Sequence, residues 1–402
     1  MQGFTFSPQR EIVILNGART PFGAFCGSFK DVSATALGVS AAKAALERSG
    51  VRPEWIDQTI FGNVIQSSPD AAYLARHVGL HVGVRIDSTA VTLNRLCGSG
   101  FEAVIAGAKE ILLGRAKFAL CGGSENMTQS PFQLWGGRTG IALGQAKMTD
   151  SLSEGLRDSY NGLPMGVTAE NLAKKYDVTR QDSDQLSLES QQKAEVARQR
   201  GVFAEEIVAV EVKKKGKVER VETDEHPRPA TTIEALAKLP LVFDKEGIVT
   251  AGSSSGICDG AAAMVLTSKD EAERRGLSYL ATLRAYGVSG CDPSIMGIGP
   301  VHAARSAVLD LGKSIDDMEV VEVNEAFAPQ VIAVERELGL KRSRLNVNGG
   351  AIALGHPLGA SGARITLSLA LELRRSQKRW GLGSACIGGG QGIAVILESN
   401  LA

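Results

Sequence analysis

A helix followed by a buried strand that runs into glycine is predicted at two places in this chain. The first has a helical segment at 100–113 and an apolar strand at 118–123 that ends in two glycines. The second has a helical segment at 362–375 and a strand from 383 that leads into the glycines at 388–390. Helices that alternate with strands are typical of layered α/β folds. The repeated order predicts two similar halves, with the functional residues gathered where the matching strand ends meet.

Other segments fit the same alternation. Ser33 and Gly50 are residues typical of the start and the end of a helix, and they bound a segment with helical periodicity at 34–49. A further helix is predicted at 303–311, and further strands are predicted at 11–15, 59–64 and 318–323. We therefore expect α/β architecture in both halves of the chain.

The region between the two halves differs in character, which indicates an insertion. It holds a glycine-punctuated stretch at 136–148, a polar helical region at 183–201, a hairpin around the basic run at 213–217 and a proline-containing loop at 224–229. Insertions of this kind commonly supply a binding loop or a lid. We therefore expect three parts. The N-terminal half comprises 1–126 and 252–279, the loop domain comprises 127–251, and the C-terminal half comprises 280–402.

The composition is that of a soluble globular protein. Hydrophobic residues make up 44%, charged residues make up 22%, and the formal net charge is zero, so a nucleic-acid partner is not expected. No stretch approaches the ~18 unbroken apolar residues of a membrane span, and the first residues lack the apolar core of a signal peptide. Six scattered cysteines without a C-x-x-C pair favour reduced thiols in an intracellular compartment. No metal site is expected, because His77 and His81 lack the glutamate of a zinc-binding H-E-x-x-H motif.

Three glycine-flanked segments carry residues suited to thiol chemistry, although each alone is more often a buried structural group. Cys97 precedes a predicted helix, whose positive N-terminus is expected to lower the pKa of the thiol. His356 lies among glycines, which allow a ligand to approach closely. Cys386 precedes a glycine turn whose N–H groups suit an oxyanion hole, and Asn324 follows a buried strand, where its amide can orient a water or a carbonyl. Together they predict covalent catalysis on a cysteine.

With these motifs the sequence closely resembles the thiolases, especially mitochondrial-type 3-ketoacyl-CoA thiolases and acetyl-CoA acetyltransferases. The matching stretches span nearly the whole chain: 19–23, 94–100, 165–170, 249–252, 323–328, 346–362 and 384–392. The resemblance implies an α/β thiolase fold, in which two similar αβα halves stack as αβαβα with an inserted loop domain. It also implies an acyltransferase with an S-acyl cysteine, which cleaves 3-ketoacyl-CoA to acetyl-CoA and a shortened acyl-CoA or condenses acetyl-CoA to acetoacetyl-CoA.

The resemblance assigns roles to individual residues. Cys97 would be the nucleophile, His356 would take its proton, and Cys386 would be the second acid and base. Asn324 would hold a water that forms one oxyanion hole with His356, and the backbone N–H groups of Cys97 and Gly388 would form the other. Coenzyme A and acyl-CoA would be substrates, and no bound cofactor is expected. The residues that match the family's coenzyme A contacts and pantetheine tunnel are Arg228, Thr231, Ser255, Leu156, Met165, Phe243 and Phe327.

One departure bears on the substrate. Leu163-Pro164-Met165 stands where biosynthetic acetoacetyl-CoA thiolases commonly have a histidine-containing loop, and this favours broader acyl chains and a role in fatty acid β-oxidation. The alternatives are a strictly short-chain biosynthetic thiolase, a decarboxylating ketoacyl synthase and an inactive thiolase-like scaffold. Cys386 disfavours the synthase, because synthases on this fold pair the nucleophile with two histidines or with a histidine and an asparagine. The intact reactive residues disfavour the scaffold.

The resemblance also implies an assembly and a compartment. A homodimer or a homotetramer is expected, with the glycine-rich stretch at 136–144 as a candidate tetramer contact. The expected location is the cytoplasm of a bacterium, or the mitochondrial matrix if the source is a eukaryote. No membrane partner is expected.

Overall fold

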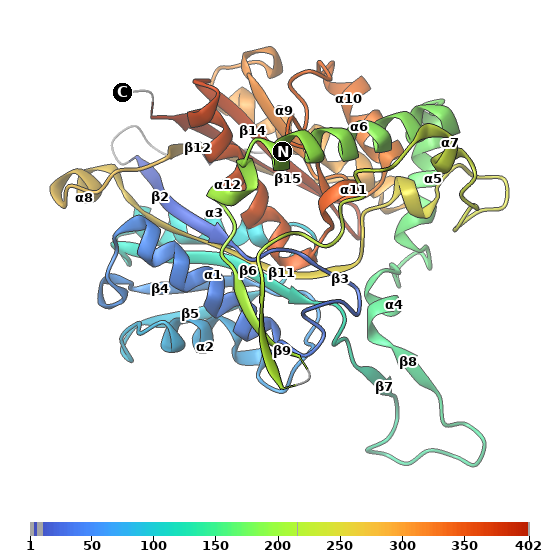
Figure 1. Ribbon diagram of the computed structural model, residues 1–402, viewed down its shortest axis with the longest axis horizontal. Coiled ribbons are helices and arrows are strands. Elements are labelled where there is room, and N and C mark those ends of the chain that lie inside the picture. Colours follow the sequence, from blue (N-terminus) through green and yellow to red (C-terminus); the bar gives the residue numbers. More distant parts are fainter. Residues whose placement is uncertain (1–3, 6–10, 215, 401–402) are drawn as a thin grey trace.

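The N-terminal half is built on strands of a mixed sheet with helices on both faces (Figure 1). The computed structural model describes residues 4–5, 11–214 and 216–400. The strands of this half are β2 (Ile12–Arg19), β3 (Gly23–Ala24), β4 (Gln58–Gly62), β5 (Thr89–Leu93), β6 (Phe118–Asn126) and β11 (Cys258–Ser268). Its helices are α1 (Ala34–Ser49), α2 (Leu74–His81), α3 (Ser99–Leu112) and α8 (Lys269–Arg274).

The C-terminal half uses the same kinds of element. Its strands are β12 (Ala281–Gly290), β13 (Val320–Val323), β14 (Trp380–Ile387) and β15 (Gln391–Ser399), and β1 (Phe4–Thr5) pairs with β12. Its helices are α9 (Gly299–Asp310), α10 (Ala328–Leu338), α11 (Ala351–Leu354) and α12 (Leu358–Arg375).

Strand pairing repeats between the halves. In the first half, β4 is parallel to β6, which is antiparallel to β11, which is antiparallel to β2. In the second half, β13 is parallel to β14, which is antiparallel to β15, which is antiparallel to β12. A short pairing between β12 and β2 joins the two sets into one continuous order, β13-β14-β15-β12-β2-β11-β6-β4-β5. The repeat predicted from the sequence is therefore present in the topology.

Helices α3 and α12 lie at the centre of the layered structure. Both contact strands of the N-terminal half, both contact each other, and α12 also packs on β13, β14 and β15. Helices α1 and α2 cover the outer face of one set of strands, and α9 covers the outer face of the other. A Cβ atom at Gly100 or at Gly362 would clash with the backbone of the opposite central helix. Glycine at these two positions thus permits direct backbone contact between the halves.

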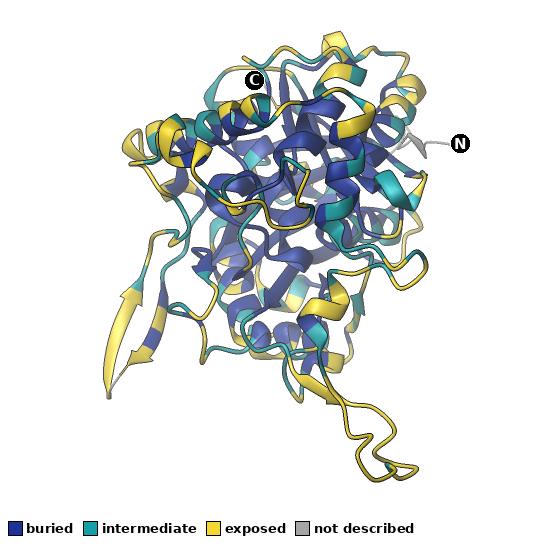
Figure 2. Ribbon diagram, turned by 90° about the vertical axis from the view of Figure 1, so that its right-hand side faces the viewer, coloured by how far each residue is buried: buried dark blue, intermediate teal, exposed yellow. Residues whose placement is uncertain are grey.

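The segment predicted to be an insertion has helices and strands of its own. Its elements are β7 (Phe132–Leu134), β8 (Met148–Asp150), α4 (Ser151–Gly155), α5 (Met165–Lys175), α6 (Arg180–Gln199), β9 (Val210–Lys214), β10 (Lys217–Val221) and α7 (Ile233–Ala237). Of its two hairpins, β9–β10 buries Val210 and Val212 in a core cluster of the N-terminal half. The longer β7–β8 arm extends away from the body and is exposed along most of its length (Figure 2). The predicted basic hairpin is β9–β10, whose tip includes position 215, which lies outside the described residues.

Local signals predicted some helix ends and missed others. Helix α1 has the predicted bounds, because Ser33 Oγ accepts the Ala36 N–H (3.2 Å) and Gly50 ends the helix in a left-handed conformation (φ 67°). The predicted starts of α9 and α12, at 303 and 362, are four residues too late. Helix α9 begins with Gly-Pro, and α12 begins with Leu-Gly-Ala-Ser. Both sequences are typical of turns, so they did not indicate a helix start, although proline is well tolerated in a first helical turn.

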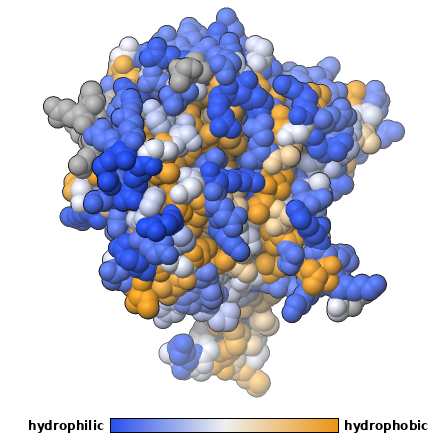
Figure 3. All heavy atoms as spheres, turned by 60° about the vertical axis from the view of Figure 1, so that its left-hand side comes forward, coloured by the Kyte–Doolittle hydropathy of each residue, from blue (hydrophilic) through white to orange (hydrophobic). Residues whose placement is uncertain are grey.

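Hydrophilic and hydrophobic residues are interspersed over the face shown in Figure 3. Within residues 4–5, 11–214 and 216–400, no helix is both long enough and apolar enough to cross a membrane. Buried apolar side chains from both halves form one continuous core around α3 and α12.

Candidate active site

Cys97 lies on a tight turn between β5 and α3. Leu96 has a left-handed backbone conformation (φ 46°), which turns the chain just before the thiol. The Oγ of Ser99 accepts a hydrogen bond from the Arg95 N–H (2.8 Å) and donates one to the Leu96 carbonyl (2.7 Å). Asn94 Oδ1 accepts a hydrogen bond from the Leu96 N–H (2.8 Å). The side chains of the turn thus fix the thiol just before the first turn of α3.

The expectation that the helix end lowers the pKa of this thiol is wrong. Cys97 keeps some accessible surface, but burial of its side chain raises the pKa to about 11. The sulfur accepts a hydrogen bond from the Gly388 N–H, which opposes this rise, whereas the carboxylate of Glu125 adds to it. Lost hydration of the thiolate outweighs the partial charge of a helix end. Cys97 is therefore a neutral thiol at pH 7 and requires a base.

His356 is buried and held in one tautomer. Its Nδ1 lies 2.5 Å from Ser361 Oγ, and that hydroxyl donates its proton to the Pro357 carbonyl at 3.0 Å. Nδ1 must therefore carry the hydrogen, which leaves a lone pair on Nε2. Burial, with Arg364 nearby, lowers the pKa of His356 to about 3, so the ring is neutral at pH 7. A neutral imidazole with a lone pair on Nε2 is the form that can accept a proton.

Cys386 and Gly388 lie at the end of β14. Cys386 is fully buried, and burial raises the pKa of its thiol well above the usual value, with further contributions from Cys97 and Cys291 nearby. Gly388 follows, and its N–H donates to the Cys97 sulfur. The structure thus brings both cysteines and the glycine turn together, although they lie almost 300 positions apart in the sequence.

Asn324 completes the group from the end of β13. Its Nδ2 lies 3.3 Å from His356 Nε2, and its backbone N–H donates to the Ser384 carbonyl at 2.8 Å. Its Oδ1 is buried and has no hydrogen-bond partner among the described residues. A buried, unpartnered amide oxygen beside the imidazole suits a bound water.

Three of the predicted tunnel residues pack with the thiols, and a fourth contacts one of these three. Leu156 packs in one apolar cluster with Cys97, and Met165 and Phe327 pack in another with Cys386. Phe243 is partly exposed and contacts the Phe327 ring edge to face, with the ring centroids 6.0 Å apart. Met165, Phe327 and Phe243 thus form one set of apolar contacts that includes Cys386.

The three predicted polar contacts lie farther out on the insertion and its margin. Thr231 Oγ1 donates to the Arg228 carbonyl (2.7 Å), and the Arg228 N–H donates to Gln191 Oε1 (2.8 Å), so this pair shares one turn. The Arg228 residue is exposed. The Ser255 N–H donates to the Ala326 carbonyl at 2.9 Å, next to Phe327. None of the three contacts the reactive thiols.

Comparison with known proteins identifies the family that carries this arrangement. The thiolase N-terminal domain matches residues 12–270, and the thiolase C-terminal domain matches residues 277–399. The chain belongs to the thiolase family. The predicted family and fold class are thereby confirmed.

Similar thiolases match over almost their whole length. The chain is 52% identical to the mitochondrial 3-ketoacyl-CoA thiolase of Homo sapiens, over 97% of this chain and 99% of the relative. It is 45% identical to an acetyl-CoA acetyltransferase of Pseudomonas aeruginosa, over 97% of this chain and 100% of the relative. A crystal structure of human mitochondrial 3-ketoacyl-CoA thiolase in complex with CoA has a TM-score of 0.95 at 52% identity, over 97% and 98% of the two chains. The predicted enzyme class, an acyltransferase of the thiolase type, is thereby confirmed.

Two buried residues of this thiolase escaped the sequence analysis. Ser361 orients His356, and its position five residues after the histidine is the only local signal for that contact. Glu125 lies at the end of β6 in a run of small residues and is close enough to Cys97 to raise its pKa. Neither residue has a periodicity or a motif that reveals its partners, because both contacts depend on how the chain folds.

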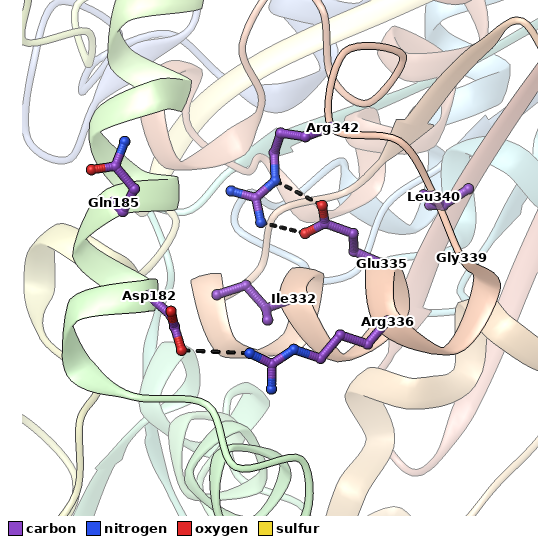
Figure 4. A pocket seen from close by; sticks show the side chains of 8 residues that line it. All are labelled: Asp182, Gln185, Ile332, Glu335, Arg336, Gly339, Leu340 and Arg342. Atoms are coloured by element: carbon purple, nitrogen blue, oxygen red, sulfur yellow. Dashed lines mark hydrogen bonds and ion pairs between the residues drawn. The ribbon is translucent and has the colours of Figure 1, made fainter.

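A surface cavity of about 440 Å³ lies elsewhere on this thiolase, between α6 and α10 (Figure 4). Arg336 and Asp182 face each other across it at 3.5 Å, and Arg342 pairs with Glu335. It contains none of the predicted site residues. Among the described residues no group of three metal-ligating side chains was found; His77 and His81 both lie on α2, with ring centroids 6.3 Å apart.

Replacing Ser361 by alanine is predicted to impair catalysis more than substrate binding. The imidazole loses the acceptor for its Nδ1–H, so the correct tautomer is no longer enforced, and we expect kcat for thiolysis to fall roughly 10- to 100-fold with KM little changed. Thr366→Val is a matched control, because it removes another buried hydroxyl that bonds within α12, at 2.8 Å from the Gly362 carbonyl. Steady-state kinetics with acetoacetyl-CoA and CoA measure both values. A Ser361→Ala enzyme with the kcat of the control would contradict the assignment.

Proposed function

We propose that Cys97, His356 and Cys386 carry out the thiolase reaction in separate roles. The observation that supports this most strongly is that the Cys97 sulfur accepts the Gly388 N–H and lies near a second buried thiol, Cys386, while His356 is a buried, neutral imidazole. Cys97 forms the S-acyl intermediate. His356 accepts its proton at Nε2, and Cys386 transfers a proton to or from the α-carbon of acetyl-CoA.

In the cleavage direction the Cys97 sulfur attacks the 3-keto carbon of 3-ketoacyl-CoA. The bond between C2 and C3 breaks, the shortened acyl group stays on sulfur, and the enolate of acetyl-CoA takes a proton from Cys386. The thiol of free CoA then attacks the acyl group and gives its proton to the Cys386 thiolate. The shortened acyl-CoA is released as the Cys97 sulfur takes its proton back from His356. Because both Cys97 and His356 are neutral at rest, proton transfer is expected to accompany attack rather than precede it.

Negative charge then develops on two carbonyl oxygens at different steps, so two oxyanion sites are needed. The backbone N–H groups of Cys97 and Gly388 form one, and a water on Asn324 together with His356 forms the other. A positioned donor in such a site typically lowers the barrier by about 3 kcal/mol. The unpartnered Oδ1 of Asn324 supports the water assignment.

Coenzyme A is proposed to bind across the loop domain at 127–251, between the N-terminal half (1–126 and 252–279) and the C-terminal half (280–402). Arg228, Thr231 and Ser255 lie at its polar end, where a cation and hydroxyls suit phosphates and amides. Leu156, Met165, Phe243 and Phe327 lie at its apolar end and exclude water from the thioester. Substrates longer than acetoacetyl-CoA are proposed, because Leu163-Pro164-Met165 supplies an apolar wall.

A homodimer or homotetramer is proposed from two exposed surfaces. β5 is the last strand in the sheet order, and Val91 on it is 46% exposed. The β7–β8 arm exposes Phe132, Trp135 and Met148, each by more than 60%. An unpaired strand edge and an apolar arm are surfaces that proteins usually cover. We propose the bacterial cytoplasm, or the mitochondrial matrix in a eukaryote, as the location of this assembly.

The division of labour between the two cysteines is testable with acetyl-CoA alone. Wild-type protein is expected to be acetylated on Cys97, Cys97→Ala to lose that label, and Cys386→Ser to retain it. Cys386→Ser should nevertheless lose carbon–carbon cleavage by the ~10²–10⁴-fold typical of a positioned acid–base group. Intact mass and peptide mapping measure the label. Separate roles are refuted if Cys386→Ser abolishes acetylation as completely as Cys97→Ala.

Chain-length preference distinguishes the proposed enzyme from a strictly short-chain biosynthetic thiolase. Each additional buried CH₂ contributes about 0.8 kcal/mol to binding, and the part retained in the transition state raises kcat/KM. We expect kcat/KM for 3-ketohexanoyl-CoA or 3-ketooctanoyl-CoA to equal or exceed that for acetoacetyl-CoA. Loss of activity beyond four carbons would instead assign the short-chain alternative.

The arm is expected to contribute to the oligomer. A Trp135→Ser/Met148→Ser variant should form a smaller assembly than the wild type while each subunit keeps its folded structure. Val218→Ser is the matched control, because Val218 is 61% exposed on the other hairpin. Multi-angle light scattering measures the mass, and a wild-type mass of 42.3 kDa at micromolar concentration would rule out the oligomer.

A further inference from the structure

Glu125 is a fully buried carboxylate at the end of β6 that accepts hydrogen bonds from two separate segments. Oε1 accepts from the Ile65 N–H (2.9 Å) and from Asn63 Nδ2 (3.2 Å). Oε2 accepts from the Val64 N–H (3.1 Å) and from the Gly359 N–H (2.8 Å). Residues 63–65 belong to the N-terminal half, whereas Gly359 lies in the first turn of α12. One side chain thus joins the two halves.

The bond to Gly359 supplies α12 with a cap from outside the helix. Pro357 precedes the helix and makes no side-chain cap, and the whole first turn is buried. Buried N–H groups at a helix start need an acceptor, and a negative charge there interacts favourably with the helix dipole. Glu125 provides both. The same turn contains Ser361, whose Oγ lies 2.5 Å from His356 Nδ1.

Glu125 is also connected by hydrogen bonds to the turn that carries Cys97. The Val64 carbonyl accepts a hydrogen bond from Asn94 Nδ2 (3.1 Å), and Asn94 Oδ1 accepts the Leu96 N–H in the turn that carries Cys97. Val64 and Cys97 also pack in one apolar cluster. A continuous set of bonds therefore runs from the Cys97 turn through Glu125 to the helix that orients His356.

The internal repeat relates the position of Glu125 to a position in the other half. Gly62 pairs with Gly123 in the first half, and Val323 pairs with Ser384 in the second. Counting onward along β6 and β14 from these pairs, Glu125 occupies the place that corresponds to Cys386. The same fold position thus carries an acid–base thiol in one half and a tethering carboxylate in the other.

We propose that Glu125 is a positioning residue that sets the geometry between Cys97 and His356 by holding the start of α12 against residues 63–65. This proposal rests on the proposed function, because it assumes that the thiol and the imidazole react together. The two carboxylate oxygens of Glu125 already accept the four hydrogen bonds described above. Glu125 is therefore not expected to contact the substrate.

Glu125→Gln tests the proposal, with Asp57→Asn as a matched control. The amide removes the charge and points an N–H group at backbone donors. Asp57 Oδ2 accepts the Lys117 and Phe118 N–H groups at the opposite end of the same strands, β4 and β6. We expect the single-turnover rate of Cys97 acetylation by acetyl-CoA to fall at least tenfold in Glu125→Gln and to stay within twofold of wild type in Asp57→Asn.

The pH dependence of the acetylation rate distinguishes a positioning role of Glu125 from general destabilisation of the protein. Burial raises the pKa of Glu125 to about 7, with Asp259 on β11 adding to the rise and the backbone donors opposing it, while the Cys97 thiol faces the carboxylate in neutral form. The wild-type acetylation rate should therefore fall as pH drops through 7, because the protonated carboxyl is a poorer acceptor. His356, with its pKa lowered to about 3, does not titrate in this range. The fall should be absent in Glu125→Gln.

Each outcome of these experiments either supports the proposal or contradicts it. Wild-type acetylation rates in Glu125→Gln, or equal losses in both variants, would overturn it. If Glu125→Gln shows no cooperative thermal unfolding, Glu125→Asp replaces it: the charge stays but the shorter side chain cannot reach both segments, so slow acetylation with the pH dependence retained is expected, and a wild-type rate overturns the proposal. Wild-type protein that is not acetylated on Cys97 would refute the proposed function instead.

Discussion

Direct backbone contact between α3 and α12 is the constraint on which the catalytic geometry depends. A side chain at Gly100 or Gly362 would clash with the opposite helix, and one at Gly123 would clash with the first turn of α12. Closely packed backbones transmit displacement instead of absorbing it. Since α3 starts just after Cys97 and α12 starts just after His356, the contact that joins the halves also fixes the segments that carry the thiol and the imidazole relative to each other.

Burial then determines the charge state of the site. It raises the pKa of both Cys97 and Cys386 and lowers the pKa of His356, so all three groups are neutral at pH 7. A resting ion pair would carry a large desolvation cost in this environment. Charge is instead expected to appear only as the sulfur attacks the carbonyl, where the Gly388 N–H and the water proposed on Asn324 can stabilise it. The arrangement thus favours the transition state over a charged resting state.

Features with a local signal could be predicted from the sequence, and features that depend on distant contacts could not. The bounds of α1 follow from Ser33 and Gly50, and the two similar halves follow from the repeated order of helix, strand and glycine. The start of α12 could not be predicted in this way, because its acceptor is Glu125, more than 230 positions earlier in the chain. The pKa of Cys97 was mispredicted for the same reason: the helix end is visible in the sequence, but the burial that outweighs it is not.

The repeat also explains how one fold supplies residues with different tasks. Asn63 and Asn324 follow matching strands, Glu125 and Cys386 lie at matching places on the next, and Cys97 and His356 each precede a central helix by two residues. In the first half the asparagine and the carboxylate bond to each other and to backbone groups, which fixes the segment next to Cys97. In the second half the asparagine amide lies beside His356, and the carboxylate position holds the thiol of Cys386. Equivalent positions therefore hold a hydrogen-bonded carboxylate in one half and the thiol that we propose to react in the other.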